Sequence, residues 1–300
     1  MNTRLNSKNF IAVTLLLSCF YIGELKNIIF PNSAVLYVAL LGALLLFMKK
    51  IDFRYITKYE LIWLLAFLLL IVGRNRRLEI GELDTNILYY GYMIVLIIVL
   101  RKNISWISSF VHFLYLISFV HATATIIFRF VPSVFQIYAA NIVSPINYAE
   151  VVKRYAAGQI TGLCVNYGLN AGILALGTGV AAIYAIFGEQ HRKKYVLATG
   201  YLLFALLLTG KRSPAIFTTA SVIAVYLLCA HEKLSQKMIK LLIGLLLGLM
   251  MIPIVLMLVP QLTVVFDRLA DMQDWSTLGG RTELYEEAIK MFKQHPVIGN

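Results

Sequence analysis

Sixty per cent of the 300 residues are hydrophobic and only 14% are charged, a balance that excludes a water-soluble domain of this size. The formal net charge of +12 does not indicate nucleic-acid binding, because the Lys and Arg residues lie in short clusters between long apolar runs. The three cysteines, Cys19, Cys164 and Cys229, fall in separate segments without metal-ligand spacing. We therefore predict neither a disulfide framework nor a metal site.

The apolar runs predict an all-α, polytopic transmembrane bundle. A helix needs roughly 20 apolar residues to cross the hydrocarbon core, and somewhat fewer where flanking Lys or Arg side chains reach the surface. The third span is the weakest, because only residues 61–73 of it are without charge. By this criterion we predict nine spans, near residues 10–30, 33–48, 58–73, 86–100, 104–128, 168–187, 195–210, 214–230 and 240–260.

The distribution of basic residues places the N-terminus in the cytoplasm, because the short connections on that side then carry most of the net positive charge. The chain divides into N-terminal helices (1–128), an outer loop (129–167) and a C-terminal region (168–300). Three arginines near the second outer connection are the exception to the charge rule. They are either balanced by nearby acids or help to bind an anionic substrate; the arginines are Arg74, Arg76 and Arg77.

Ionisable residues are scarce inside the spans. No Asp, Glu, Lys or Arg falls in the middle of a predicted span, and only His112 and His121 lie near the fifth one. Such histidines are either functional groups or neutral imidazoles bonded to a neighbouring helix. A proton relay is not indicated.

The outer loop contains a short amphipathic segment. From residue 147 to 157, apolar side chains repeat at helical spacing while the charged ones face elsewhere. This pattern predicts a short helix that lies in the membrane interface and covers a cavity between the spans.

Two cations lie in the short turn between the seventh and eighth spans. Lys211 and Arg212 follow Gly210 where the chain leaves the membrane on the outer side. The turn is not a P-loop, because Ala205 stands where the first Gly is required and no strand precedes it. As charges that merely flank a span, the two would be expected inside the cell. Their position at the height of a lipid-linked diphosphate favours a function.

The C-terminal outer segment predicts an amphipathic helix over residues 282–294. Its acidic side chains lie in the early turns and Lys290 and Lys293 in the late ones, as the helix dipole prefers, and Pro296 ends it. Arg281 stands at the N-terminus of this helix, where unsatisfied backbone N–H groups favour an anion.

Together these residues resemble the O-antigen ligase and O-antigen polymerase superfamily of polytopic membrane glycosyltransferases. Residues 209–213 look like the T-x-S-R element that follows a span in this family, with Lys211 where the family often has Ser. Arg154, followed by residues 162–170, looks like the R…G-x-x-x-N-x-x-x-N stretch that enters a span.

A third element looks like the G-R-x-x-x-W…P-x-x-G element of the family. It runs from Gly280-Arg281 to Tyr285, which replaces the usual Trp, and continues through 295–299. The resemblance covers roughly residues 150–300 and keeps the order of the family. It departs in one respect: the family has a further outer His and more spans after this helix. We expect that the sequence is either a fragment or lacks this candidate base.

The resemblance implies transfer of a glycan from undecaprenyl diphosphate to a glycan or lipid acceptor at the outer face of the bacterial inner (cytoplasmic) membrane. It implies no metal, nucleotide or other cofactor. The expected partners are the lipid-linked oligosaccharide, its acceptor and membrane lipids, and not nucleic acid. The candidate residues are catalytic Arg212 and Arg281, which clamp the diphosphate, and substrate-binding Lys211, Arg154, Tyr285, Asn166 and Asn170.

Other functions stay open at this point. A transporter or flippase for lipid-linked oligosaccharide also needs outer cations, but it should show cations on both leaflets and pseudo-symmetric halves, and neither is visible in the sequence. An assembly subunit without chemistry is a third alternative, which gains support if residue 300 is the natural C-terminus. Within the glycosyltransferase class, the sequence does not distinguish a polymerase from a ligase.

Overall fold

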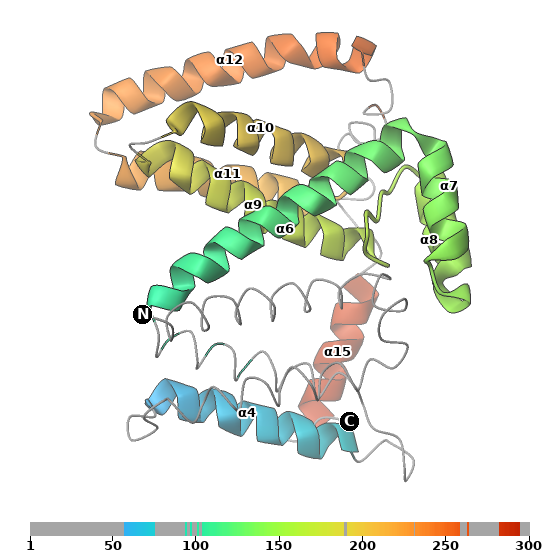
Figure 1. Ribbon diagram of the computed structural model, residues 1–300. Helices are drawn as coiled ribbons and strands as arrows, with labels where there is room; N and C mark the ends of the chain where they lie inside the picture. Colours follow the sequence, from blue (N-terminus) through green and yellow to red (C-terminus); the bar gives the residue numbers. More distant parts are fainter. Residues whose placement is uncertain are drawn as a thin grey trace, which may run out of the picture. The chain divides into compact units, whose positions relative to one another are not determined.

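The computed structural model describes residues 57–75, 94, 97, 101, 104–188, 191–230, 232–258, 263 and 282–294. Every regular element in this part of the chain is an α-helix (Figure 1), which confirms the all-α fold class. The helices are α4 (Lys58–Asn75), α6 (Ile104–Phe130), α7 (Pro132–Asn141), α8 (Pro145–Ala156), α9 (Tyr167–Phe187), α10 (Arg192–Leu208), α11 (Arg212–Cys229), α12 (Leu234–Leu258) and α15 (Thr282–Gln294).

Three of the described helices are long and apolar enough to cross a membrane. They are Phe110–Phe130 within α6, Tyr167–Phe187 and Arg212–Cys229, and they coincide with the predicted spans near 104–128, 168–187 and 214–230. Helix α4 contains only a shorter apolar stretch, Glu60–Leu69. This agrees with the weakness of the third predicted span.

The remaining predicted spans divide into two groups. Helices α10 and α12 occupy the spans predicted near 195–210 and 240–260, and the helical backbone of α12 continues through Pro253. The spans predicted near 10–30 and 33–48 lie outside the described residues, as does nearly all of the one near 86–100.

The chain splits into two compact units. The first contains α4 and α15, and the bounds of α15 confirm the amphipathic helix predicted over 282–294. Helix α4 begins with a reciprocal capping box, in which Thr57 N donates to Glu60 Oε2 at 2.8 Å and Glu60 N to Thr57 Oγ1 at 3.4 Å. The second unit includes residues 110–270 and carries α7 to α12 together with most of α6.

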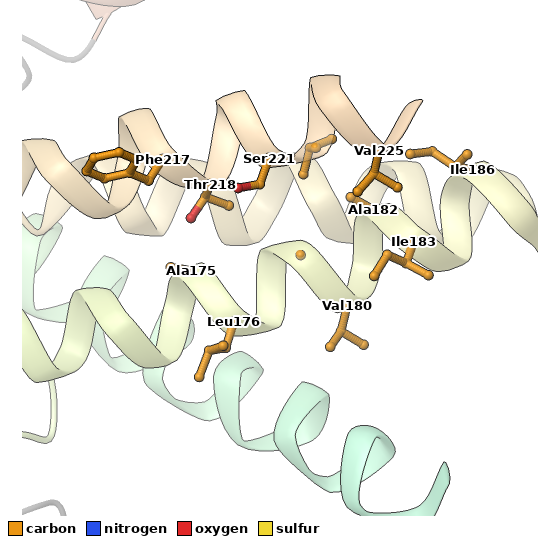
Figure 2. A pocket seen from close by; sticks show the side chains of 12 residues that line it. Ala175, Leu176, Val180, Ala182, Ile183, Ile186, Phe217, Thr218, Ser221 and Val225 are labelled. Atoms are coloured by element: carbon orange, nitrogen blue, oxygen red, sulfur yellow. The ribbon is translucent and has the colours of Figure 1, made fainter. Parts of the chain in front are cut away.

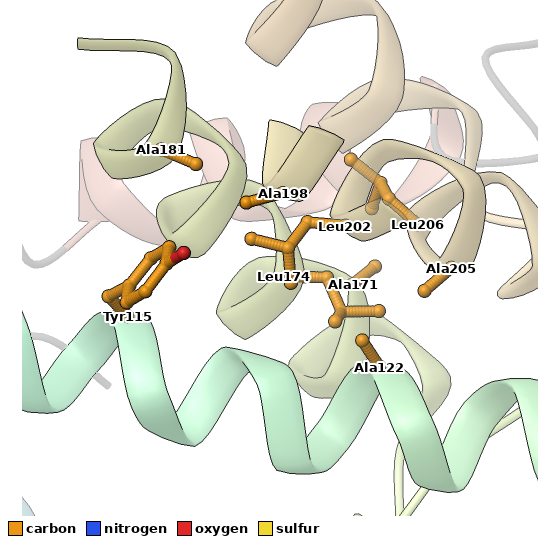
Figure 3. Close-up of a cluster of buried hydrophobic side chains, with 9 residues drawn as sticks. All are labelled: Tyr115, Ala122, Ala171, Leu174, Ala181, Ala198, Leu202, Ala205 and Leu206. Atoms are coloured by element: carbon orange, nitrogen blue, oxygen red, sulfur yellow. The ribbon is translucent and has the colours of Figure 1, made fainter. Parts of the chain in front are cut away.

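In the second unit, α6, α9 and α10 pack around a core of small and apolar side chains. Alanine occupies most positions of this core, and small residues let helix backbones approach closely inside a membrane. Ser118 of α6 joins the two longer helices by donating its hydroxyl to Ile173 O of α9 at 2.9 Å. The core consists of Tyr115, Ala122, Ala171, Leu174, Ala181, Ala198, Leu202, Ala205 and Leu206 (Figure 3).

Helices α9, α10 and α11 follow one another through short connections and lie side by side (Figure 1). Because α10 runs back along α9, helices α9 and α11 both begin at the same end of the unit. The opposite end of α11 is held by Lys237, whose Nζ donates to Leu227 O at 2.7 Å. A cation is favourable there because the last carbonyls of a helix carry partial negative charge.

Helices α7 and α8 pack with the end of α6 into a second core. The short helix predicted near 147–157 is confirmed as α8, and its Val151 is only 1% exposed. The Phe135 and Tyr155 rings stack with 3.7 Å between centroids. Tyr155 also donates its hydroxyl to Phe128 O at 2.8 Å. Burial raises the pKa of Tyr155, so the phenol keeps the proton that this hydrogen bond requires.

Gly177 tests the close packing of α6 on α9. A Cβ at this position would collide with the Ser118 side chain, whereas a Cβ at Gly179, on the same helix, would meet nothing within 4 Å. We expect Gly177→Ala to destabilise the protein by about 1–3 kcal/mol, as overpacked cores do. Gly179→Ala should be neutral or slightly stabilising. Thermal unfolding midpoints of both variants in detergent provide the comparison, and equal midpoints would contradict this packing.

Candidate functional site

Two helix N-termini meet at one end of the second unit. Asn166 caps α9, where its Oδ1 accepts a hydrogen bond from Gly168 N at 2.6 Å. Helix α11 begins at Arg212 after Lys211, whose backbone is extended and whose side chain makes no capping hydrogen bond. The first backbone N–H groups of a helix have no intrahelical acceptor and carry partial positive charge. Both helix ends therefore favour a nearby anion.

The turn that carries Lys211 is held in place by its neighbours. Thr209 is fully buried, and its hydroxyl donates to Leu206 O at 2.7 Å and accepts from Lys211 N at 3.2 Å. Gly210 has a φ of +72°, and a Cβ there would lie 3.2 Å from Gly158 O. A side chain is thus disfavoured by both backbone conformation and space. The turn packs directly against the segment that follows α8.

This packing brings Lys211 and Arg154 of α8 to the same aromatic ring, that of Tyr167. Lys211 Nζ lies 4.8 Å from the centroid of the Tyr167 ring, and Arg154 Cζ lies 5.0 Å from the same centroid. Tyr167 is the first residue of α9. Arg154 Nη2 also pairs with Glu150 Oε1 at 2.6 Å. The structure therefore brings together two cations that are 57 positions apart in the sequence.

Arg212 adds a third positive charge beside Lys211. It is half-buried at the first position of α11. We call Arg154, Lys211 and Arg212 the cationic cluster. Glu150 pairs with Arg154 of this cluster, and the first N–H groups of α9 and α11 add partial positive charge beside the three cations. Such a concentration of positive charge suits a ligand with more than one negative charge.

The two asparagines of the G-x-x-x-N-x-x-x-N stretch differ in burial. Asn166 is exposed at the start of α9, whereas Asn170 is 0% exposed. The Asn170 amide donates to Thr125 Oγ1 at 2.9 Å and to Ile160 O at 3.2 Å. It also packs against Gly162, where a Cβ would lie 2.7 Å from the amide and where φ is +57°. Asn170 thus holds the loop that leads to Asn166.

The nearby His121 is buried in contact with that loop. Its Nδ1 lies 3.8 Å from Cys164 Sγ, and its own carbonyl accepts a hydrogen bond from Thr125 Oγ1 at 2.7 Å. Of the two interpretations of this histidine, these contacts favour the structural one. His112, in contrast, is exposed.

The other candidate residues belong to the first unit or are outside the described part. Arg281 lies outside the described residues, as do Arg76 and Arg77. Tyr285 lies on α15, with 54% of its surface exposed. Arg212 and Arg281 belong to different units. The clamp expected between them therefore stays a prediction.

An apolar groove runs between α9 and α11 (Figure 2). Its volume is about 390 Å³, and it begins at Ala175 and Phe217, the second of which follows Arg212 by five residues. At 1.5 Å per helical residue, that is about 8 Å along the helix axis. Gly179 faces open space there. The start of α11, which carries Lys211 and Arg212, thus precedes an apolar groove along the same helix.

Sequence reasoning missed two residues of this site. Tyr167 lies between the two asparagines of the recognised stretch, and Glu150 lies one helical turn before Arg154. The i, i+4 spacing of Glu150 and Arg154 on a predicted helix was a usable signal. No sequence pattern indicated that Lys211 and Arg154 share the Tyr167 ring, because this arrangement depends on tertiary packing.

The comparisons with known proteins give one match. Residues 197–300 match the family model described as O-antigen ligase. No curated protein and no solved structure matches the chain. The matched range contains Lys211, Arg212 and helix α15, whereas Arg154 and α9 precede it. The resemblance to O-antigen ligases is therefore confirmed over the C-terminal third, and it supports this general type of function in a membrane protein.

The role of the Asn170 amide in holding the loop that leads to Asn166 can be tested by substitution. Replacing it with Ala leaves Ile160 O without its amide donor in a fully buried position, which should destabilise the protein by about 1–3 kcal/mol. Asn141→Ala is the matched control, because the Asn141 amide also donates to a backbone carbonyl, Ile137 O at 2.8 Å, but is exposed. Unfolding midpoints in detergent should fall for Asn170→Ala only, and similar values for both variants would refute the supporting role.

Proposed function

We propose that this protein transfers a glycan from an undecaprenyl-diphosphate donor to a hydroxyl group of an acceptor at the outer face of the bacterial cytoplasmic membrane. The observation that carries the proposal is the cationic cluster, in which α8, α9 and α11 bring Arg154, Lys211 and Arg212 to the start of two membrane-spanning helices. The match of residues 197–300 to O-antigen ligase supports the same class of reaction.

The position of the cluster favours a lipid-linked anion over a soluble one. Helices α9 and α11 are long enough to cross the hydrocarbon, so their first residues lie near the membrane surface. A diphosphate on a lipid carrier is confined to that level. The groove between α9 and α11 begins about 8 Å beyond Arg212 along α11, and it offers an apolar surface for the isoprenoid chain of a bound diphosphate.

The chemical role of the cations follows from where negative charge develops during the transfer. In the transfer, the acceptor oxygen bonds to the anomeric carbon, the bond from that carbon to the diphosphate oxygen breaks, and the hydroxyl proton passes to a base or to water. Negative charge builds up on the departing diphosphate. A hydrogen bond to a charged group contributes roughly 1.5–3 kcal/mol, and fixed donors at a low-dielectric boundary act most strongly on the transition state.

Arginine is better suited than lysine to the main contacts. Its planar guanidinium donates two parallel hydrogen bonds to phosphate oxygens, whereas an ammonium group acts as a point charge. We assign the clamp to Arg212 and, from the resemblance, to Arg281 at the start of α15. Lys211 and Arg154 supply additional positive charge. Tyr285 holds α15 in position by packing, and α15 in turn orients Arg281. With these cations in place, the reaction needs no metal ion.

The clamp is tested by Arg212→Ala and Arg281→Ala. Each variant should lose roughly 10²–10³-fold in transfer rate, the usual cost of removing one donor to a developing oxyanion. Arg212→Lys and Arg281→Lys should recover little of it, because the bidentate contact is lost. The measurements are polymer length or ligation in cells and transfer by the purified protein in vesicles.

Arg192→Ala is the matched control for these variants. Arg192 is an exposed arginine at the first position of α10, at the opposite end of the helices from the cluster, and its replacement should leave transfer unchanged. Full activity of both Ala variants at normal protein levels would refute the clamp. Accessibility labelling of single cysteines that places positions 212 and 281 on opposite sides of the membrane would refute it independently.

The groove is tested by Gly179→Leu, which fills open space between α9 and α11. It should raise KM roughly tenfold for a long-chain donor, through lost apolar burial of the chain. The KM for a farnesyl-diphosphate-linked donor, whose chain is short, should change much less. Gly200→Leu on α10 is the control, because a Cβ there also meets nothing within 4 Å. An equal increase for both donors would contradict this location of the chain.

A further inference from the structure

We infer that Tyr167 is the positioning residue that holds Arg154 and Lys211 together as one receptor for the diphosphate. This inference rests on the proposed function, and it gives a role to an aromatic side chain that neither hydropathy nor the family resemblance marks. Tyr167 opens α9, next to the capping residue Asn166. The ring is thus attached to the rigid start of a membrane-spanning helix.

Two like charges share this single ring. Arg154 Cζ lies 5.0 Å and Lys211 Nζ 4.8 Å from its centroid, so the charges are no more than about 10 Å apart, close to the Debye length in physiological salt. At this separation salt weakens their mutual repulsion, but without a shared contact the two flexible side chains would still be free to move apart. The negative face of an aromatic ring attracts a cation within about 6 Å of its centroid. Tyr167 therefore offsets the repulsion without adding a negative charge.

The absence of a formal charge on the ring matters for binding. A carboxylate between the two cations would neutralise them and compete with the phosphate oxygens. A cation held over an aromatic face keeps N–H groups that point away from the ring and can donate to an anion. The Tyr167 ring thus fixes where the cations lie while leaving their charge available to the ligand.

Glu150, unlike the Tyr167 ring, partly neutralises the cation that it contacts, Arg154. Its Oε1 lies 2.6 Å from Arg154 Nη2, and its side chain is half exposed. An arriving diphosphate therefore competes with Glu150 for the guanidinium of Arg154. This competition predicts that removing the carboxylate strengthens anion binding, whereas removing the ring weakens it.

The ring is tested by replacement at position 167 in the purified full chain in nanodiscs, with radiolabelled farnesyl diphosphate as the probe. Tyr167→Phe keeps the aromatic face and should change Kd by less than about twofold. Tyr167→Leu should raise Kd roughly five- to thirtyfold, the range expected from cation–π energies. Tyr148→Leu is the control, because Tyr148 is an exposed tyrosine on the same helix as Arg154.

A graded series separates cation binding from packing. Phenylalanines carrying one, two and three fluorines at position 167 keep nearly the same shape while the negative potential of the ring face decreases. Kd should rise with each fluorine. In transfer assays, the factor by which KM rises should exceed the factor by which kcat falls. Constant Kd values along the series would overturn the inference and leave Tyr167 a packing residue.

Three further variants complete the test. Glu150→Gln should lower Kd roughly threefold by removing the competing charge; weaker binding would show that Glu150 positions Arg154, against the inference. Arg154→Ala and Lys211→Ala distinguish a failure of the Tyr167 role from a failure of the diphosphate site. If both weaken binding while the fluorine series stays flat, only the role of Tyr167 is refuted. If neither changes Kd, the proposed diphosphate site itself fails.

Discussion

The candidate site of the second unit depends on holding two like charges at one aromatic ring. Arg154 and Lys211 approach one aromatic ring, and Arg212 follows directly at the start of α11. Repulsion between such groups is stronger beside a nonpolar medium than in bulk water, because the effective dielectric constant is lower. The fold opposes it with constraints that carry little negative charge: a buried turn at Thr209, an aromatic ring, and one half-exposed carboxylate.

The sequence predicted the helices well where the bilayer itself imposes the pattern. A span must satisfy its backbone hydrogen bonds internally and be apolar over about 20 residues, so α6, α9 and α11 could be located from hydropathy alone. Dipole-matched charges located α15, whose bounds agree with the predicted 282–294. Helix α10 was predicted a few residues too far along the chain because Arg192 and the two lysines after it belong to the helix, although they are not apolar.

The candidate site was predicted only in part. Motif spacing selected Arg154, Lys211 and Asn166, and the structure brings them to one end of α9 and α11. Spacing could not distinguish the exposed Asn166 from the buried Asn170, because burial is decided by α6 and by the loop through Ile160. Tyr167 was missed for a related reason. An aromatic residue at a helix start has many possible roles, and only tertiary packing adds the two cations.

Rigidity at this site comes from backbone positions as much as from the charged side chains. Gly162 and Gly210 both have positive φ and both face closely packed neighbours, so each fixes a bend that other residues adopt only with strain. One bend seats the loop on the Asn170 amide, and the other seats the Lys211 turn on the segment that follows α8. Positioning the cations in this way before a ligand arrives removes part of the ordering cost of binding. In the proposed transfer, the negative charge that develops on the diphosphate then meets donors that need not reorganise.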